Sequence, residues 1–133
     1  MEISHINPDG IYKHPAFTSI VTVSDPQKLH FFAGRTPADE SYRCVAPGDM
    51  LAQYRQVMNI LTRELEEVGA TWSDVVYRRI FTTDVDACLA AAASPEIASF
   101  FDPDRMPPST LVGVTRLSDP EFMVEIDLLA VTE

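Results

Sequence analysis

Cysteine is scarce in this 133-residue chain, which contains only Cys44 and Cys88. The two residues form neither a C-x-x-C motif nor a framework of regularly spaced pairs, so a disulfide-stapled scaffold is not indicated. We expect a reduced protein with incidental thiols. The three histidines, His5, His14 and His30, show no ligand spacing either. We therefore predict that the protein has no metal site.

Basic residues are also few, with ten Lys and Arg against twenty Asp and Glu and a formal net charge of -10. A protein that binds a phosphate backbone needs a basic patch to release counterions, so nucleic acid is not an expected partner. No apolar run is long enough to cross a bilayer, and the first residues lack the basic and apolar regions of a signal peptide. We expect a cytoplasmic protein without membrane association. A G-x-S-x-G motif is absent too, which argues against a serine hydrolase.

Hydrophobic residues make up 46% of the chain, and no linker, repeat or low-complexity tract interrupts it, so residues 1–133 are expected to form one globular domain. Alternating and β-branched segments predict strands at 17–23, 29–33, 75–83, 110–116 and 122–131. The first two are expected to form a hairpin across a turn at 24–27. Gly34 ends that hairpin, where a glycine indicates a positive φ or a close backbone approach.

Helical spacing of apolar residues from Met50 to Val68 predicts a long helix, with Asp49 as its N-cap and Gly69 just after its C-terminus. A capping-box pattern at Thr83 predicts a second helix, which Pro95 interrupts or restarts.

This order of elements predicts an α+β fold, in which a mixed sheet of about six strands carries two helices on one face. No helix is left to cover the other face. Strands this apolar are poorly suited to face water over a large patch, so self-association is expected.

Several motifs occur together in a specific order and spacing, and they run through most of the chain. They are Phe32-Ala33-Gly34-Arg35-Thr36-Pro37, Glu67-Val68-Gly69-Ala70, Asp74-Val75-Val76, Phe81-Thr82-Thr83-Asp84-Val85, Ser109-Thr110-Leu111-Val112-Gly113-Val114-Thr115-Arg116-Leu117 and Val124-Glu125-Ile126-Asp127. This set resembles the Rid (YjgF/YER057c) family of small enamine and imine deaminases. The resemblance implies a chorismate-mutase-like fold, a homotrimer packed through its sheets, and a cleft between subunits for a small-molecule ligand. It implies neither a metal nor an organic cofactor.

In the deaminase members of that family, an arginine just before the Ser or Thr of the penultimate strand clamps the substrate carboxylate. The first Glu of the last strand positions or activates water. Carried over, Glu125 matches the catalytic acid, Gly34 matches the hairpin glycine, and Ala33 stands where a serine is usual. Phe17 keeps the ring of a pocket tyrosine without its hydroxyl, and Ser109 occupies the arginine position. The substrate-binding set implied for this chain comprises Phe17, Ala33, Gly34, Arg35, Ser109 and Thr110.

Another arginine could replace the missing clamp, since Arg35, Arg79 and Arg105 all lie near matched segments. We favour Arg35 because it follows Gly34, although each of the three is also compatible with an ordinary surface position. Alternation along the last strand places Val124, Ile126 and Leu128 toward the helices, which leaves Glu125 on the face between subunits.

Two functions remain open. The first is a RidA-like hydrolase or deaminase for an enamine, imine or related small electrophile, with no appreciable activity on 2-iminopropionate because Ser109 cannot neutralise a carboxylate. The second is a non-catalytic trimeric protein that binds a small metabolite. A ribonuclease activity, attributed to some relatives, fits poorly with the net charge.

Overall fold

A four-stranded sheet forms the centre of the molecule in the computed structural model, which describes residues 1–133. Its strands are β3 (Lys28–Arg35), β4 (Val75–Thr82), β5 (Ser109–Gly113) and β6 (Val124–Thr132), in the spatial order β3-β6-β4-β5. β6 is antiparallel to both of its neighbours, whereas β4 and β5 are parallel. The sheet is therefore mixed, as the sequence predicted.

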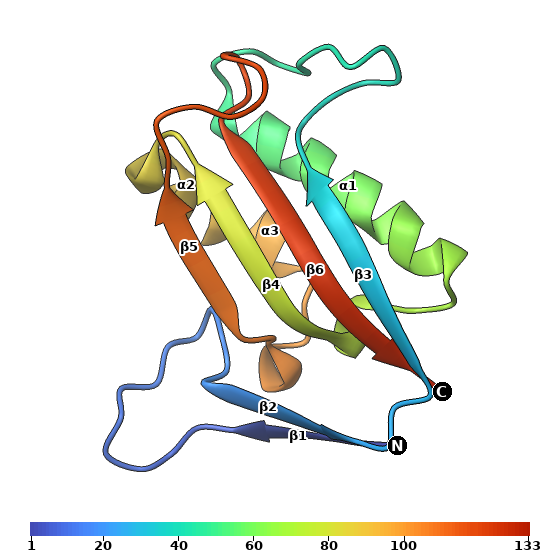
Figure 1. The fold of residues 1–133 in the computed structure, drawn as a ribbon. Helices are drawn as coiled ribbons and strands as arrows, with labels where there is room; N and C mark the ends of the chain where they lie inside the picture. The colour runs from blue at the N-terminus through green and yellow to red at the C-terminus, as the bar shows by residue number, and fades with distance from the viewer.

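The helices α1 (Met50–Glu67), α2 (Val85–Ala92) and α3 (Pro95–Ala98) all lie behind the sheet in the view of Figure 1. The predicted ends of α1 are confirmed, because the Asp49 carboxylate accepts a hydrogen bond from the Ala52 N–H at 3.1 Å and Gly69 has a φ of +71°. Two short 3-10 turns, Trp72–Asp74 and Pro103–Arg105, precede β4 and β5.

The second helical region is divided as the position of Pro95 predicted, because Pro95 begins α3 and Ser94 caps it. The predicted start at Thr83 is one residue early. Asp84 is the N-cap of α2, and its carboxylate accepts a hydrogen bond from the Ala87 N–H at 3.1 Å. A carboxylate suits this position because it satisfies a free N–H at the positive end of the helix.

The hairpin predicted between residues 17–23 and 29–33 is wrong. β2 (Ile20–Ser24) pairs antiparallel with β1 (Glu2–Ile6), a strand that the sequence analysis did not identify, and β3 pairs with β6. Figure 1 shows β1 and β2 as a separate ribbon below the main sheet. The expected number of strands is thus right, but the strands divide into a four-stranded and a two-stranded sheet. The long apolar β6 offers β3 more paired length and apolar contact than β2 does.

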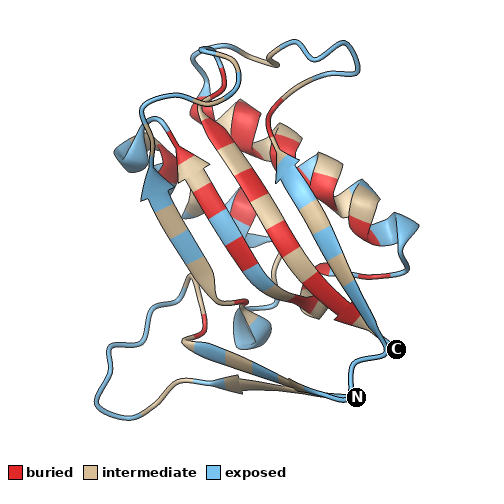
Figure 2. Ribbon diagram, in the orientation of Figure 1, coloured by how far each residue is buried: buried red, intermediate tan, exposed pale blue.

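The hydrophobic core lies between the main sheet and the helices. Val57, Leu61 and Leu65 of α1 are buried against the inward-facing side chains of β6, which include Val124 and Ile126. Buried and half-buried residues alternate along β6, as Figure 2 shows. Burial of each such aliphatic side chain contributes about 1.5–3 kcal/mol, which selects the face that β6 turns toward the helices.

The opposite face of the sheet has no helix over it (Figure 1). Apolar side chains nevertheless extend from this face: Phe31 is 77% exposed, and Leu29 and Tyr77 are exposed as well. We call it the open face. It carries the side chains of β6 that do not point into the core, and Glu125 is one of them.

Candidate functional site

Glu125 lies on β6, opposite Phe81 of β4, with its carboxylate against the backbone of β3. A Cβ atom at Gly34 would lie only 2.8 Å from the Glu125 Oε2 atom and 2.9 Å from Cδ. Because the φ of Gly34 is not positive, conformational freedom does not explain the glycine. The close approach to Glu125 does, which is one of the two reasons that the sequence suggested.

A β-bulge brings this backbone close to the carboxylate. Phe32 pairs with Leu128 and Arg35 with Ile126, so β3 advances three residues while β6 advances two. Ala33 and Gly34 fill the irregular stretch. Bulges bend a strand locally and are common beside functional sites. The sequence offered the glycine as a signal but not the shift in register.

The Glu125 carboxyl group has a raised pKa, first because burial penalises its charged form and second because Asp127 carries a like charge two residues away. Glu125 takes part in none of the ion pairs of the chain. A carboxyl group whose pKa is shifted toward neutrality, with no basic partner, is suited to proton transfer.

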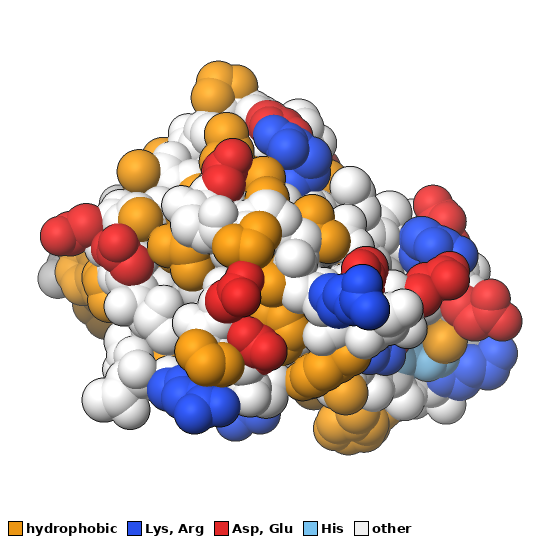
Figure 3. Space-filling model, turned by 90° about the horizontal axis from the view of Figure 1, so that it is seen from above, with side chains coloured by type: hydrophobic (Ala, Val, Ile, Leu, Met, Phe, Trp, Pro, Cys, Tyr) orange, Lys and Arg blue, Asp and Glu red, His pale blue; other side chains and the backbone are white.

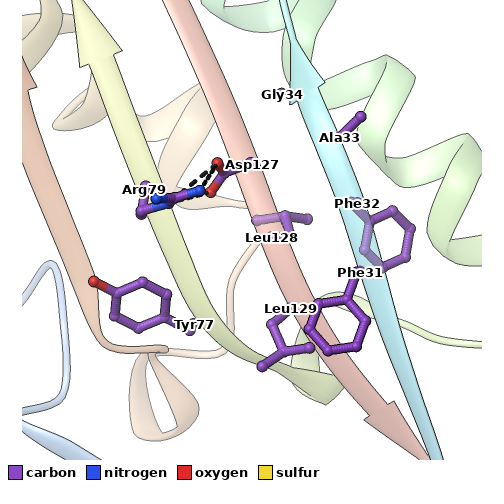
Figure 4. A pocket seen from close by; sticks show the side chains of 9 residues that line it. All are labelled: Phe31, Phe32, Ala33, Gly34, Tyr77, Arg79, Asp127, Leu128 and Leu129. Atoms are coloured by element: carbon purple, nitrogen blue, oxygen red, sulfur yellow. Dashed lines mark hydrogen bonds and ion pairs between the residues drawn. The ribbon is translucent and has the colours of Figure 1, made fainter.

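Asp127, in contrast, is fully engaged by Arg79 on the neighbouring strand. Arg79 Nε donates to Asp127 Oδ1 at 3.0 Å and Nη2 donates to Oδ2 at 2.7 Å, as the dashed lines in Figure 4 show. The fork compensates the charge of Asp127, whose side chain is only 18% exposed. Arg79 was one of the three predicted substitutes for the clamp, but its pairing with Asp127 depends on the antiparallel register of β4 and β6 and has no signal in the sequence.

A depression of about 630 Å³ extends along the open face from this ion pair toward β3 (Figure 4). Its lining residues are Phe31, Phe32, Ala33, Gly34, Tyr77, Arg79, Asp127, Leu128 and Leu129. Most are apolar, and Arg79 and Asp127 supply its charges. The Tyr77 hydroxyl is 2.7 Å from Thr110 Oγ1, which places Thr110 on the same face of the sheet. The predicted residues Ala33, Gly34, Thr110 and Glu125 therefore share the open face.

The family model described as endoribonuclease L-PSP matches residues 12–132. The chain is 31% identical over 102 residues to the RutC family protein slr0709 of Synechocystis, covering 76% of each chain, and 28% identical over 103 residues to the RutC family protein PYRAB12510 of Pyrococcus abyssi, covering 77% of this chain and 78% of the relative. Its structure resembles that of YyfB from Yersinia pestis, a Rid family protein of unknown function, with a TM-score of 0.85, 26% identity, and coverage of 99% and 100% of the two chains.

The chain belongs to the Rid family. Its α+β fold of sheets and helices is that of the Rid structures to which it is similar. The family resemblance seen in the sequence motifs is thereby confirmed. The chemistry of this Rid chain still depends on where its own residues lie.

Two predicted residues of this Rid protein, Phe17 and Ser109, lie at the opposite end of the sheet from Glu125. The Thr18 N–H donates to the Pro107 carbonyl at 3.4 Å, which brings the segment after Phe17 to the start of β5. Ser109 pairs with Arg78, whereas Glu125 pairs with Phe81 three residues further along β4. Since strand residues advance about 3.3 Å each, these pairs are roughly 10 Å apart. Within a single chain, the predicted site residues therefore fall into two separate groups, one with Phe17 and Ser109 and one with Glu125.

The three arginines proposed to replace the family clamp are placed differently. Arg35 donates to both carboxylate oxygens of Glu64 on α1, each at 2.7 Å, so it is paired on the helix side. Arg79 is paired with Asp127. Arg105 lies close enough to His5 to contribute, after burial, to the lowered pKa of that imidazole.

The chain contains no group of three or more His, Cys, Asp or Glu side chains arranged to hold a metal ion. None of its helices combines the length and hydropathy that crossing a membrane requires.

Proposed function

We propose that this Rid protein is a hydrolase of the deaminase type, acting on an enamine, an imine or a related small electrophile. The observation that carries the proposal is the Glu125 carboxylate, which has no ion-pair partner and packs against the backbone of Gly34, a residue that lines the depression. Membership of the Rid family supports the assignment of the reaction class. The chemistry needs no group beyond water and a carboxylate.

In the proposed reaction, water adds to the carbon of the C=N bond while Glu125 accepts one of its protons. The new C–O bond forms as the π electrons move to nitrogen, which takes up a proton from solvent. The resulting carbinolamine then breaks its C–N bond while its hydroxyl proton passes to solvent, releasing ammonia and leaving a carbonyl product. Glu125 acts as the base in the first step and returns the proton to nitrogen in the second, so its raised pKa suits both roles.

We further propose that the reaction takes place in a cleft between subunits of a cytoplasmic homotrimer. The exposed apolar side chains of the open face, Phe31 above all, favour association through the sheet. Phe17 and Ser109 lie far from Glu125 within one chain. A neighbouring copy would bring the two groups together.

The proposed substrate is not 2-iminopropionate. Ser109 occupies the position of the family arginine, and its hydroxyl cannot neutralise a carboxylate attached directly to the imine carbon. Ala33 and Phe17 also remove hydroxyl groups from the implied pocket.

A panel of imines, produced in situ from amines and amino acids by oxidases, tests this proposal through the release of ammonia. Glu125→Gln should abolish the turnover of any substrate found, and Glu67→Gln, on the solvent-exposed end of α1, should retain it. Rapid hydrolysis of 2-iminopropionate by the wild-type protein would refute the substrate assignment. Turnover that Glu125→Gln leaves unchanged would refute the mechanism.

The second candidate is a trimeric binding protein without catalysis, which the replacement of the family arginine by Ser109 favours. Saturable binding of a metabolite that is never converted, in wild type and Glu125→Gln alike, would establish it. RNA cleavage is a weaker candidate despite the name of the family model. The net charge is -10, and Figure 3 shows basic side chains dispersed among acidic and apolar ones with no basic patch on that face.

A further inference from the structure

Arg78 is the one arginine of β4 that points into the helix layer. It is only 5% exposed. Its guanidinium carbon lies 4.6 Å from the centre of the Phe101 ring, and its Nη2 atom donates to the Ala16 carbonyl at 2.7 Å. Ala16 is half-buried and belongs to the segment between β1 and β2, which reaches the start of β5 in Figure 1.

No acidic group compensates this buried charge. Arg78 is absent from the ion pairs of the chain, whereas Arg35, Arg55 and Arg79 each pair with a carboxylate. The Arg78 Nε atom is buried without any hydrogen-bond partner. Burial lowers the pKa of the guanidinium, and the phenol of Tyr54 is the only group that opposes this shift. A buried cation without a charged partner destabilises a protein, so a structural role alone is a poor explanation for it.

Arg78 is also the direct neighbour of Ser109. The two residues are paired in the parallel register of β4 and β5, and the Arg78 N–H donates to the Pro108 carbonyl at 3.1 Å. Paired residues project from the same face of a sheet, about 4.8 Å apart. Arg78 therefore lies one strand inward from Ser109, which occupies the position of the family arginine and carries no positive charge.

We propose that Arg78 is a buried anion anchor that binds a carboxylate group of the ligand. Phe101 and the Ala16 carbonyl orient the guanidinium group of Arg78, and its unpaired Nε–H supplies a donor for a carboxylate oxygen. The anchor itself is independent of the chemistry at Glu125. Its consequence for the substrate rests on the proposed function. Arg78 points into the helix layer and Glu125 lies on the open face, so a substrate that used both groups would reach them in a cleft between subunits, with its carboxylate separated from the reacting carbon.

Binding of simple carboxylates tests the anchor without any assumption about turnover. The probes are propionate and its neutral analogue propionamide, at constant ionic strength, followed by the ¹⁵N–¹H signal of the arginine Nε groups and by the thermal unfolding temperature. Propionate should move the Arg78 Nε–H signal saturably and raise the unfolding temperature, because a ligand that binds only the folded state stabilises it. Propionamide should do neither.

Arg78→Met removes the charge at similar volume and identifies the Nε–H signal by its loss. Propionate should bind this variant more than about tenfold more weakly, since a charge-assisted hydrogen bond contributes roughly 1.5–3 kcal/mol. Arg55→Gln, which breaks an exposed ion pair with Glu96 on the helix side, should bind propionate like wild type. Should Arg78→Met fail to fold, Arg78→Lys keeps the charge, loses the fork, and should weaken binding while retaining the fold.

An unchanged Nε–H signal in wild-type protein, or equal stabilisation of wild type and Arg78→Met by propionate, would overturn the anchor. Glu125→Gln should bind propionate normally. If Glu125→Gln loses turnover but still binds propionate, both proposals are supported. If no imine is turned over by the wild-type protein and propionate binding still depends on Arg78, only the enzymatic function is rejected.

Discussion

Gly34 and Glu125 are in contact across the β3–β6 pair, so closely that a methyl group on Gly34 would overlap the Glu125 carboxylate. The bulge in β3 produces this contact, and the glycine permits it. The position of the acid therefore depends on a residue that has no functional group of its own.

Gly34→Ala should displace the Glu125 carboxylate and destabilise the fold by about 1–3 kcal/mol, because the added Cβ would lie 2.8 Å from Oε2. A misplacement of this kind can reduce turnover about 100-fold. Urea denaturation measures the stability. In a Glu125→Ala background, the same glycine substitution should cost almost nothing, since the clashing atoms are gone. Equal costs in the two backgrounds would contradict the contact.

The gain in the free energy of unfolding that Glu125→Gln gives over wild type should be larger at pH 7 than at pH 4. Because the folded-state pKa of Glu125 is raised, the folded protein binds more protons than the unfolded chain between the two pKa values, and stability falls as pH rises through that window. The amide does not ionise, so the variant lacks this loss. Urea denaturation of both proteins at the two pH values checks the sign. A variant whose relative stability decreases from pH 4 to pH 7 would show that the ionised carboxylate is favoured instead.

Arg79→Gln should raise the pKa of Glu125 further. The substitution leaves the Asp127 charge without its compensating fork, and Asp127 already contributes to the raised pKa. A ¹³C NMR titration of the glutamate carboxyl carbons, with Glu125→Gln to assign the signal, measures the change. Arg35→Gln is the matched control, because it breaks a similar pair with Glu64 on the helix side. A shift of the same size in both variants would mean that Asp127 is not the cause.

Phe31→Asp should convert the proposed trimer into monomers. Phe31 is 77% exposed on β3, an edge strand of the open face, where a charge would be buried upon association. Light scattering should give three times the chain mass for the wild-type protein and the mass of one chain for the variant. Leu89→Asp, an exposed apolar position on α2, should leave the mass unchanged. A monomeric wild-type protein would remove the basis for a cleft between subunits.

Much of the fold was predictable because it depends on local patterns. The long helix with Asp49 and Gly69 at its ends, the break at Pro95 and the inward face of β6 all follow from spacing and capping chemistry that a short segment contains. The family motifs likewise assigned Glu125 and Gly34 to one predicted site before their contact was visible. The partner of β2 was not predictable, since strand pairing depends on competition among strands distant in sequence.

The sequence by itself thus determined the α+β elements, the family, and the loss of the arginine at position 109. Only the tertiary structure decided what the remaining arginines do, because the charge of a guanidinium group is compensated only if folding places a carboxylate beside it. Arg35 and Arg79 meet carboxylates from another element and are neutralised, whereas Arg78 meets an aromatic ring and a carbonyl and keeps an uncompensated charge. Ion pairing depends on distances of a few ångströms between residues far apart in the chain, and no local pattern encodes those distances.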